Sequence, residues 1–204
     1  MLLIELAVPV EKIPYIRTIE GRRFRNGLWF FPESSANTLK QIGLLDEEYI
    51  VEEKKTIYYQ TSNFLRKYQK DIVNKALNHE GYGIFMDTGT GKTVCALEIA
   101  KHLGKTLVLC PLSVIETAWI DDCHKFYPEL RIVNCWGENR KQRYDALETD
   151  SDVYVMNYES FKILKNKIAK MNFKCMVVDE SSVMKNMTAQ ITSEILSMID
   201  VIPR

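Results

Sequence analysis

Short apolar runs alternate with helical segments along most of this chain, and this alternation restricts the possible folds more than any other feature. From about residue 63 onward, β-rich runs fall at 82–86, 105–111, 131–136, 152–157 and 173–180. Segments with helical spacing separate them, at 92–104, 113–127, 138–148 and 159–170. Strands that alternate with helices form a parallel sheet with helices on both faces. We therefore predict an α/β lobe over 63–204.

Residues 1–62 do not follow this alternation. The start, "MLLIELAVPV", carries Glu5 and lacks a basic leader, so it is interpreted as a strand rather than a secretory signal. The pair Asn26-Gly27 stands between two β-prone runs and is typical of a two-residue hairpin turn, since both turn positions need positive φ. A short helical stretch ends at Gly43, and a charged connector follows over 46–56. We expect a small α+β module here.

Composition and charge exclude several classes of protein. With 46% apolar and 26% charged residues the chain is globular. The 27 basic and 27 acidic side chains cancel, so nucleic acid would have to bind to a local patch. The five cysteines show no Cys-X-X-Cys spacing, which indicates reduced, buried thiols and not a zinc site. The apolar runs are too short to span a bilayer. We expect a cytoplasmic monomer without a membrane partner (in the host cytoplasm if the source is viral).

The segment "DTGTGKT" (87–93) has the chemistry of a phosphate-binding loop. It follows a β-rich run and opens a helix, and parallel sheets bind ligands at the carboxyl ends of their strands. Backbone N–H groups around Gly89 and Gly91 can surround phosphate oxygens, Lys92 can neutralise them, and the Thr93 hydroxyl can hold Mg²⁺. Met86 stands where the strict pattern has a glycine. The alternative is an ordinary glycine turn with an exposed lysine, but the strand–loop–helix context favours the phosphate loop.

A second candidate site lies at the end of the last β-rich run, where Asp179 and Glu180 are adjacent. The first carboxylate can hold Mg²⁺ through water, and the second can orient or deprotonate an attacking water. The alternative is an acidic helix cap, because such residues are common at that position. Together with the loop at 87–93, the catalytic interpretation is favoured.

The order of these motifs resembles that of the superfamily 2 helicases, and within them the SWI/SNF-type DNA translocases. The segment 65–77 is similar to the family's adenine-recognition segment and "MDTGTGKT" to its motif I. The segment "LVLCPLSVIETAW" (107–119) resembles motif Ia, "VMNYESF" (155–161) resembles the next block, and "DESSVMKN" (179–186) resembles motif II. The resemblance covers about 63–204.

The resemblance implies a RecA-like P-loop lobe that binds ATP and Mg²⁺ and moves on DNA, with duplex or branched DNA favoured. It implies that Gln69 reads the adenine edge. The nucleotide-binding set is Arg66, Gln69, Thr88, Gly89, Thr90, Gly91, Lys92 and Thr93. The catalytic set is Lys92, Asp179 and Glu180, with Thr93 and Asp179 as the Mg²⁺ residues. The DNA-facing positions are Pro111, Ser113, Asn157 and Tyr158.

The chain departs from the family pattern in two places. Ser181-Ser182 replaces the Ala-His or Gly-His of many relatives, and that histidine helps to couple the ATP state to the DNA-binding motifs. The Asp-Glu-Ser-Ser form is similar to phage and prokaryotic relatives. The chain also stops at "VIPR", before motif III and the second lobe that supplies the arginine finger. Loss of such a finger typically lowers turnover by a factor of about 10³–10⁵, so we expect weak hydrolysis by this chain alone.

A basic hairpin in the first module is a candidate DNA contact. Arg22, Arg23 and Arg25 can take phosphates, while neighbouring aromatic rings can stack on unpaired bases. The hairpin loosely resembles the accessory module of annealing-helicase relatives, which recognises branched DNA. The alternative is a solvated basic strand whose aromatic residues, Phe24 and Trp29, face inward as a small core.

Two other functions compete with a DNA translocase. A P-loop phosphotransferase would leave Gln69 and the "DESSVMKN" segment unexplained. A non-catalytic DNA-binding module on a nucleotide-binding fold is disfavoured by the intact set of Lys92, Thr93, Asp179 and Glu180. Stimulation of ATP hydrolysis by DNA separates the three.

Overall fold

The computed structural model describes residues 3–25, 28–46, 48, 56–179, 189–198 and 201–204. The chain divides into two compact units, Met1–Thr56 and Ile57–Arg204, called here the N-terminal and C-terminal units. Among the described residues, no helix combines the length and the apolar character that crossing a membrane requires.

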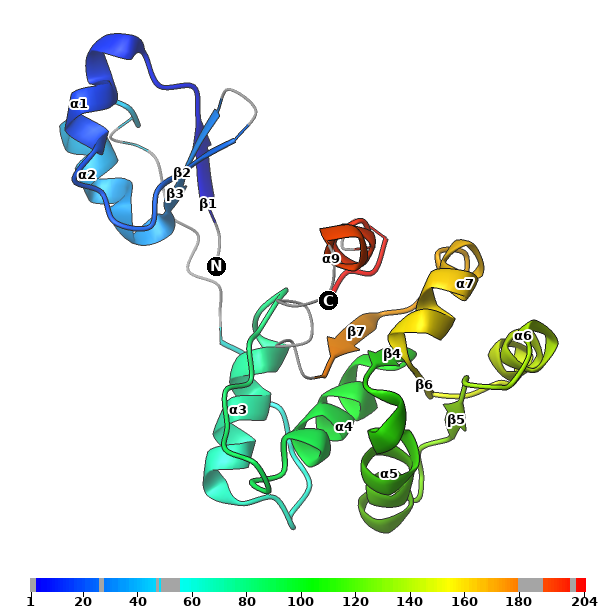
Figure 1. Cartoon of the computed structure of the whole chain (residues 1–204). Coiled ribbons are helices and arrows are strands. Elements are labelled where there is room, and N and C mark those ends of the chain that lie inside the picture. Colours follow the sequence, from blue (N-terminus) through cyan, green and yellow to red (C-terminus); the bar gives the residue numbers. More distant parts are fainter. Residues whose placement is uncertain (1–2, 26–27, 47, 49–55, 180–188, 199–200) are drawn as a thin grey trace. The chain divides into compact units, whose positions relative to one another are not determined.

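The N-terminal unit is an antiparallel sheet with short helices. Its strands β1 (Leu3–Leu6), β2 (Arg23–Arg25) and β3 (Leu28–Pro32) lie in the order β1-β3-β2. Helices α1 (Ile13–Ile16) and α2 (Ala36–Gln41) complete the unit (Figure 1). The pairing of Arg25 with Leu28 confirms the predicted hairpin, whose turn residues 26 and 27 lie outside the described part of the chain. The small core contains Ile4, Ile16, Ile19, Phe31, Ala36 and Leu39.

The C-terminal unit confirms the predicted α/β lobe. Its strands are β4 (Thr106–Leu109), β5 (Ile132–Asn134), β6 (Val153–Met156) and β7 (Cys175–Val178). All are parallel, in the order β5-β6-β4-β7. The helices are α3 (Lys67–Leu77), α4 (Lys92–Leu103), α5 (Asp121–Phe126), α6 (Arg140–Glu148), α7 (Tyr158–Ile168) and α9 (Ala189–Leu196). A 3-10 turn, η3 (Leu112–Val114), and a π-helix, η4 (Ile115–Ile120), join β4 to α5.

Successive residues of the inner strands face opposite layers of helices, which explains why these strands are continuous apolar runs. Val108 of β4 packs in one core with residues of α3, α4 and α5. Leu107 and Leu109 pack in a second core with residues of α6, α7 and α9. Figure 1 shows these two groups of helices on opposite sides of the sheet. The inner strands β4 and β6 are therefore buried on both faces, which leaves the strand ends as the place where this sheet can bind a ligand.

The predicted strand at 82–86 is wrong, because the structure forms no strand there. Phe85 is 92% exposed, which a residue within a covered sheet could not be. At the edge of β7, the Met176 N–H donates instead to the carbonyl oxygen of Arg204 at 2.6 Å. Glycines at 81 and 83 add backbone freedom that opposes a strand. The loop at 87–93 is consequently entered from an irregular segment.

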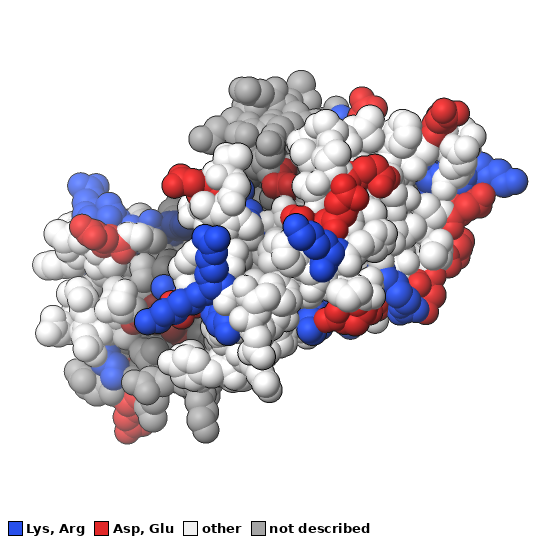
Figure 2. All heavy atoms as spheres, turned by 90° about the horizontal axis from the view of Figure 1, so that it is seen from below, with Lys and Arg blue, Asp and Glu red and all other residues white. Residues whose placement is uncertain are grey.

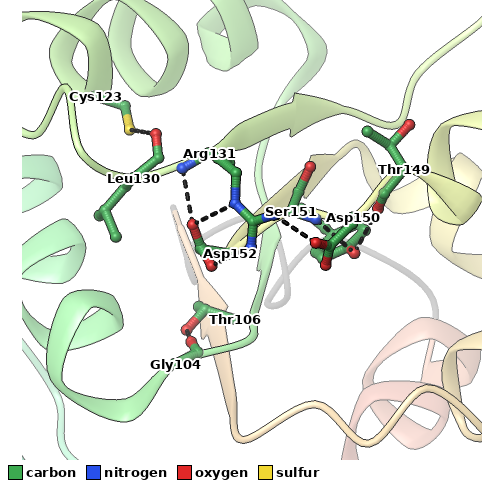
Figure 3. Close-up of polar contacts among 10 residues, drawn as sticks. Gly104, Thr106, Cys123, Leu130, Arg131, Thr149, Asp150, Ser151 and Asp152 are labelled. Atoms are coloured by element: carbon green, nitrogen blue, oxygen red, sulfur yellow. Dashed lines mark hydrogen bonds and ion pairs between the residues drawn. The ribbon is translucent and has the colours of Figure 1, made fainter.

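An ion-pair network fixes the amino ends of β5 and β6 (Figure 3). The backbone N–H and Nε of Arg131 donate to Asp152 Oδ2 at 2.9 and 3.2 Å, and Nη2 donates to Oδ1 at 3.0 Å. Nη1 reaches the Asp150 carboxylate at 2.5 Å. The Arg131 hydrogen bonds hold the pKa of Asp152 below its usual range, against the opposing effect of burial.

This network makes stability depend on pH in the acidic range. Because the pKa of Asp152 is lowered in the folded protein, its contribution is complete above the ordinary value of 3.8 and is lost as the pH falls through the lower folded value. We expect Asp152→Asn to flatten the fall in unfolding free energy below about pH 4. Urea denaturation at several pH values measures this. The matched control is Asp145→Asn, at an exposed carboxylate of α6, and equal pH dependence in both variants would contradict the assignment.

Candidate nucleotide-binding site

The helix α4 begins with a glycine that no other residue could replace without cost. Gly91 is the N-cap of α4 and has φ 88°, in the left-handed region that favours glycine. A Cβ atom there would lie 2.5 Å from Gln69 Nε2, too close for a real contact. Gly89 also has positive φ, 77°, in the same loop. The two glycines let the loop turn tightly into the amino end of α4, where backbone N–H groups favour an anion.

Lys92, the first residue of α4, folds back over its own loop. Its Nζ donates to the carbonyl oxygens of Met86 at 3.0 Å and Asp87 at 3.1 Å. The Thr90 hydroxyl also donates to the Asp87 oxygen, at 2.5 Å. The ammonium group is thus held by neutral oxygens that a phosphate group could replace with charged ones. Thr88 is exposed in the same loop, and Thr93 is half-buried in the first turn of α4.

The start of α3 is tied to this loop. The buried Gln69 side chain accepts from the Arg66 N–H at 2.8 Å and donates to the Thr90 carbonyl oxygen at 3.1 Å. The Tyr68 hydroxyl donates to the same Thr90 oxygen, at 3.0 Å. Each polar end of the Gln69 amide thus makes one bond within the protein, and a second N–H of Nε2 and a second lone pair of Oε1 remain for an adenine edge. Sequence reasoning missed Tyr68, although its position beside Gln69 on an exposed helix start was a usable signal.

Asp179 directly follows β7 and is held from three directions. Its N–H donates to the carbonyl oxygen of Leu109, the last residue of β4, at 2.8 Å. Its own carbonyl oxygen accepts from the Tyr158 hydroxyl at 2.6 Å. Its Oδ2 accepts from the indole Nε1 of Trp119 at 3.1 Å. The predicted residues Glu180, Ser181 and Ser182 lie outside the described part of the chain.

The cysteines surround the sheet as buried thiols, as the sequence predicted. All five are free and buried. Burial raises the pKa of the Cys110 thiol to about 12, and the nearby Asp179 carboxylate adds to this shift. Burial likewise raises the pKa of Cys135 to about 12. Thiols with such pKa values remain protonated and are poor nucleophiles at neutral pH.

The four predicted DNA-facing positions differ in exposure. Ser113 is exposed in η3, directly after Pro111 and Leu112. Asn157 caps α7 instead, since its side chain accepts from the Ser160 N–H at 3.0 Å, and it is only 9% exposed. Tyr158 is 5% exposed, with its hydroxyl on Asp179. The surface after β4 is thus open to a partner, whereas the side chains after β6 are engaged inside the unit.

The hairpin of the N-terminal unit exposes part of its aromatic face. Phe24 is 60% exposed, with its ring centroid 5.0 Å from that of the half-buried Trp29. The alternative in which Phe24 and Trp29 form a small core thus holds for Trp29, which packs against the core of the unit, but not for Phe24. The core of the unit lies around Phe31 and Ile4, and β2 is an edge strand beyond it. Arg23, next to Phe24 in β2, is exposed on the opposite face of the strand. Arg22 Nη1 donates to the Ile19 carbonyl oxygen at 2.8 Å, and the Arg25 side chain is outside the described structure.

On the face seen in Figure 2, charges do not gather into one large field. Figure 2 shows basic and acidic side chains interspersed over the visible face, in keeping with the net charge of zero. Any nucleic acid contact must therefore come from local features such as the β2–β3 hairpin or the segment after β4.

The sequence is similar to known ATPases over most of its length. A family model described as "SNF2-related domain" matches residues 22–202. The chain is 30% identical over 129 residues to the SWI/SNF-related matrix-associated actin-dependent regulator of chromatin subfamily A-like protein 1 homolog of Caenorhabditis elegans, covering 61% of this chain and 18% of that protein. It is 26% identical over 155 residues to the chromatin-remodeling ATPase INO80 of Saccharomyces cerevisiae (strain YJM789), covering 65% and 10%. The chain thus spans less than a fifth of these relatives.

A solved structure shares the fold. The Sulfolobus solfataricus SWI2/SNF2 ATPase core in complex with dsDNA aligns with a TM-score of 0.55 at 25% identity. The alignment covers 72% of this chain and 31% of that one. The same core domain described without DNA aligns with a TM-score of 0.52 at 27% identity.

The contact between α3 and the loop can be tested at Gly91. We expect Gly91→Ala to lower the free energy of unfolding by about 2–4 kcal/mol, as the sum of left-handed strain and a clash with Gln69. Gly89→Ala is the matched control, because it has a similar φ of 77° but nothing within 4 Å of the added Cβ, and should cost only about 1–2 kcal/mol. Urea denaturation gives both values.

A second variant separates the clash from the strain. Adding Gln69→Ala to Gly91→Ala removes the side chain that the new Cβ would meet, so the double variant should recover part of the loss expected from the clash. Strictly additive effects of the two substitutions would show that Gln69 does not press on the loop at this point.

Proposed function

This chain belongs to the SNF2-related domain family, and from that premise we propose that it is the ATP-binding lobe of an ATP-dependent DNA translocase. The observation that carries the proposal is the start of α4, where a left-handed Gly91 and the folded-back Lys92 form a loop suited to phosphate. Asp179 follows β7 in the same unit, at the carboxyl edge of the sheet, where ligands of parallel sheets bind.

We assign the phosphates of ATP to the loop. Backbone N–H groups at residues 88–91 and the first turn of α4 would surround the phosphate oxygens. Lys92 would exchange the carbonyl oxygens of Met86 and Asp87 for the β- and γ-phosphates. The positive charge then lies where negative charge develops during transfer, which is how such loops lower the barrier.

Thr93 and Asp179 would hold Mg²⁺. A hydroxyl and a carboxylate are the hard oxygen ligands that this ion prefers, and few protein ligands are needed because it keeps several waters. When bound, the ion neutralises charge on the transferred phosphoryl group. Glu180, next in sequence to Asp179, is proposed as the residue that orients the attacking water.

Gln69 and Arg66 would meet the adenine end of the nucleotide. Gln69 already bonds the Thr90 carbonyl oxygen in the loop, and Arg66 is the exposed N-cap of α3. A base would take the second N–H and the second lone pair of this amide, while the existing bonds keep α3 on the loop. The residue that meets the base is in this way bonded to the loop that holds the phosphates.

DNA is the proposed polymer partner, and duplex or branched DNA is favoured. The aligned Sulfolobus solfataricus core is in complex with dsDNA, which supports the duplex. In the C-terminal unit the exposed η3, with Ser113 after Pro111, is the proposed contact. In the N-terminal unit the exposed Phe24 and Arg23 support contact with branched DNA through stacking and phosphate binding.

We propose residues 63–204 as the motor lobe and residues 1–62 as an accessory module. The aligned ATPase core is covered to only 31% by this chain, which supports the proposal that turnover needs a second motor lobe. Nucleotide binding by these 204 residues alone is therefore the direct test of the loop, and DNA-stimulated hydrolysis is the test of the complete motor.

The loop assignment predicts that Lys92→Ala weakens binding of Mg²⁺-ATP by about 10- to 100-fold, since a charged hydrogen-bonding group to phosphate is lost. A fluorescent ATP analogue titrated into the purified chain measures this. Lys101→Ala is the matched control at the other end of α4, where Lys101 pairs with Glu129 at 2.7 Å on the surface. Equal affinity in the wild type and Lys92→Ala would remove the loop from the nucleotide site.

The translocase assignment predicts that hydrolysis by the protein carrying both lobes is stimulated strongly by duplex or forked DNA. Hydrolysis should be measured without DNA and with single-stranded, duplex and forked DNA, alongside Lys92→Ala as the inactive reference. Turnover indifferent to DNA would favour a P-loop phosphotransferase. Binding of DNA without any turnover would favour a non-catalytic module on the same fold.

A further inference from the structure

Trp119 connects two parts of the C-terminal unit that are far apart in sequence. It lies in η4, is only 2% exposed, and its indole Nε1 donates to Asp179 Oδ2 at 3.1 Å. The two residues are 60 positions apart. A buried indole N–H requires an acceptor, and here that acceptor is the carboxylate proposed to hold Mg²⁺.

The local backbone around Trp119 is unusual. Residues Ile115–Ile120 form a π-helix, a conformation that is rare and is frequently found at functional sites. The same segment reaches β5, because Glu116 accepts from Asn134 Nδ2 at 2.6 Å. Hence η4 bonds residues at the ends of β5 and β7, the two outer strands of the described sheet.

We propose that Trp119 is a positioning residue for Asp179, setting the orientation of its carboxylate toward the metal ion. This rests on the proposed function, in which Asp179 holds Mg²⁺. The Tyr158 hydroxyl, on the Asp179 carbonyl oxygen at 2.6 Å, fixes the backbone of the same residue. Trp119 and Tyr158 therefore link the segments after β4 and β6 to one residue, Trp119 through its carboxylate and Tyr158 through its backbone.

The orientation of this carboxylate matters because Mg²⁺ demands nearly ideal octahedral geometry. An indole N–H on Oδ2 limits rotation of the carboxylate and so fixes the plane in which its oxygens lie. Groups that hydrogen-bond to metal ligands typically change metal affinity by about 10- to 100-fold when they are removed. A purely packing role for Trp119 would give no such dependence on the metal.

We expect Trp119→Phe to weaken binding of the nucleotide only where that binding depends on Mg²⁺. The aromatic ring is kept while the N–H is removed, so the Mg²⁺ concentration needed for half-maximal binding of a fluorescent ATP analogue should rise about 10-fold or more. Affinity for the analogue in EDTA should stay unchanged. Trp136→Phe, at the 38% exposed tryptophan after β5, is the matched control and should alter neither value. Thermal unfolding of each variant shows whether it is folded.

A double-mutant cycle with Asp179→Ala separates this inference from the function on which it rests. If Trp119 acts through Asp179, adding Trp119→Phe to Asp179→Ala should not raise the Mg²⁺ concentration needed for half-maximal binding any further. A higher Mg²⁺ requirement in Asp179→Ala, together with an unchanged requirement in Trp119→Phe, would overturn the role of Trp119. An unchanged Mg²⁺ requirement in Asp179→Ala would instead overturn the proposed metal role of Asp179, and with it the positioning role of Trp119.

Emission from Trp119 itself provides a test that needs no change at that residue. The chain has three tryptophans, so Trp29→Phe with Trp136→Phe leaves Trp119 as the single reporter. Mg²⁺ added with ATP should change its emission, because the hydrogen-bonded carboxylate gains a cation, and Asp179→Ala in this background should abolish the change. If the nucleotide binds but the emission of Trp119 does not change when Mg²⁺ and ATP are added, the proposal is contradicted.

Discussion

The register of β4 in the sheet is the constraint on which the candidate site depends. Leu109 pairs with Met156 of β6 on one side and with Val178 of β7 on the other, so three parallel strands end at the same level. The residue after each strand therefore lies along one edge. A shift of one residue in β7 would turn Asp179 to the opposite face and break its N–H bond to Leu109.

Burial of the sheet on both faces makes that register robust. Residues such as Val108 and Leu109 point into different cores, and a slip would exchange their environments as well as move the strand ends. The energy that fixes the edge thus comes from apolar packing well away from it. Polar groups at the edge then need only make short local bonds, as Tyr158 and Trp119 do with Asp179.

Elements whose sequence signal is local could be predicted from the sequence. Features that depend on residues distant in the chain could not. The strands β4–β7 and the turn into α4 follow from apolar runs and from glycines that precede Lys92. The run at 82–86 is also apolar, but it contains a glycine and a strand needs a neighbour, and the N–H of Met176 on the β7 edge bonds Arg204 instead. The exposure of Phe24 could not be predicted for a similar reason. Alternation along β2 predicts the face of the sheet on which Phe24 lies, but not how far the core extends beneath that face. Trp119 was visible only as an apolar residue of its segment, since its acceptor lies 60 residues later.

The two halves of the candidate site are held by different elements, and this division has a consequence for coupling. The phosphate loop is bonded to α3 through Gln69 and Tyr68 on the Thr90 carbonyl oxygen. Asp179 is bonded to η4 and α7 through Trp119 and Tyr158. A nucleotide with its metal ion would bridge the halves and so connect α3 with the segments that follow β4 and β6. If the proposed nucleotide site is correct, these four side chains are the hydrogen-bonded contacts that join it to α3, η4 and α7, and they are where coupling to the exposed η3 is to be tested.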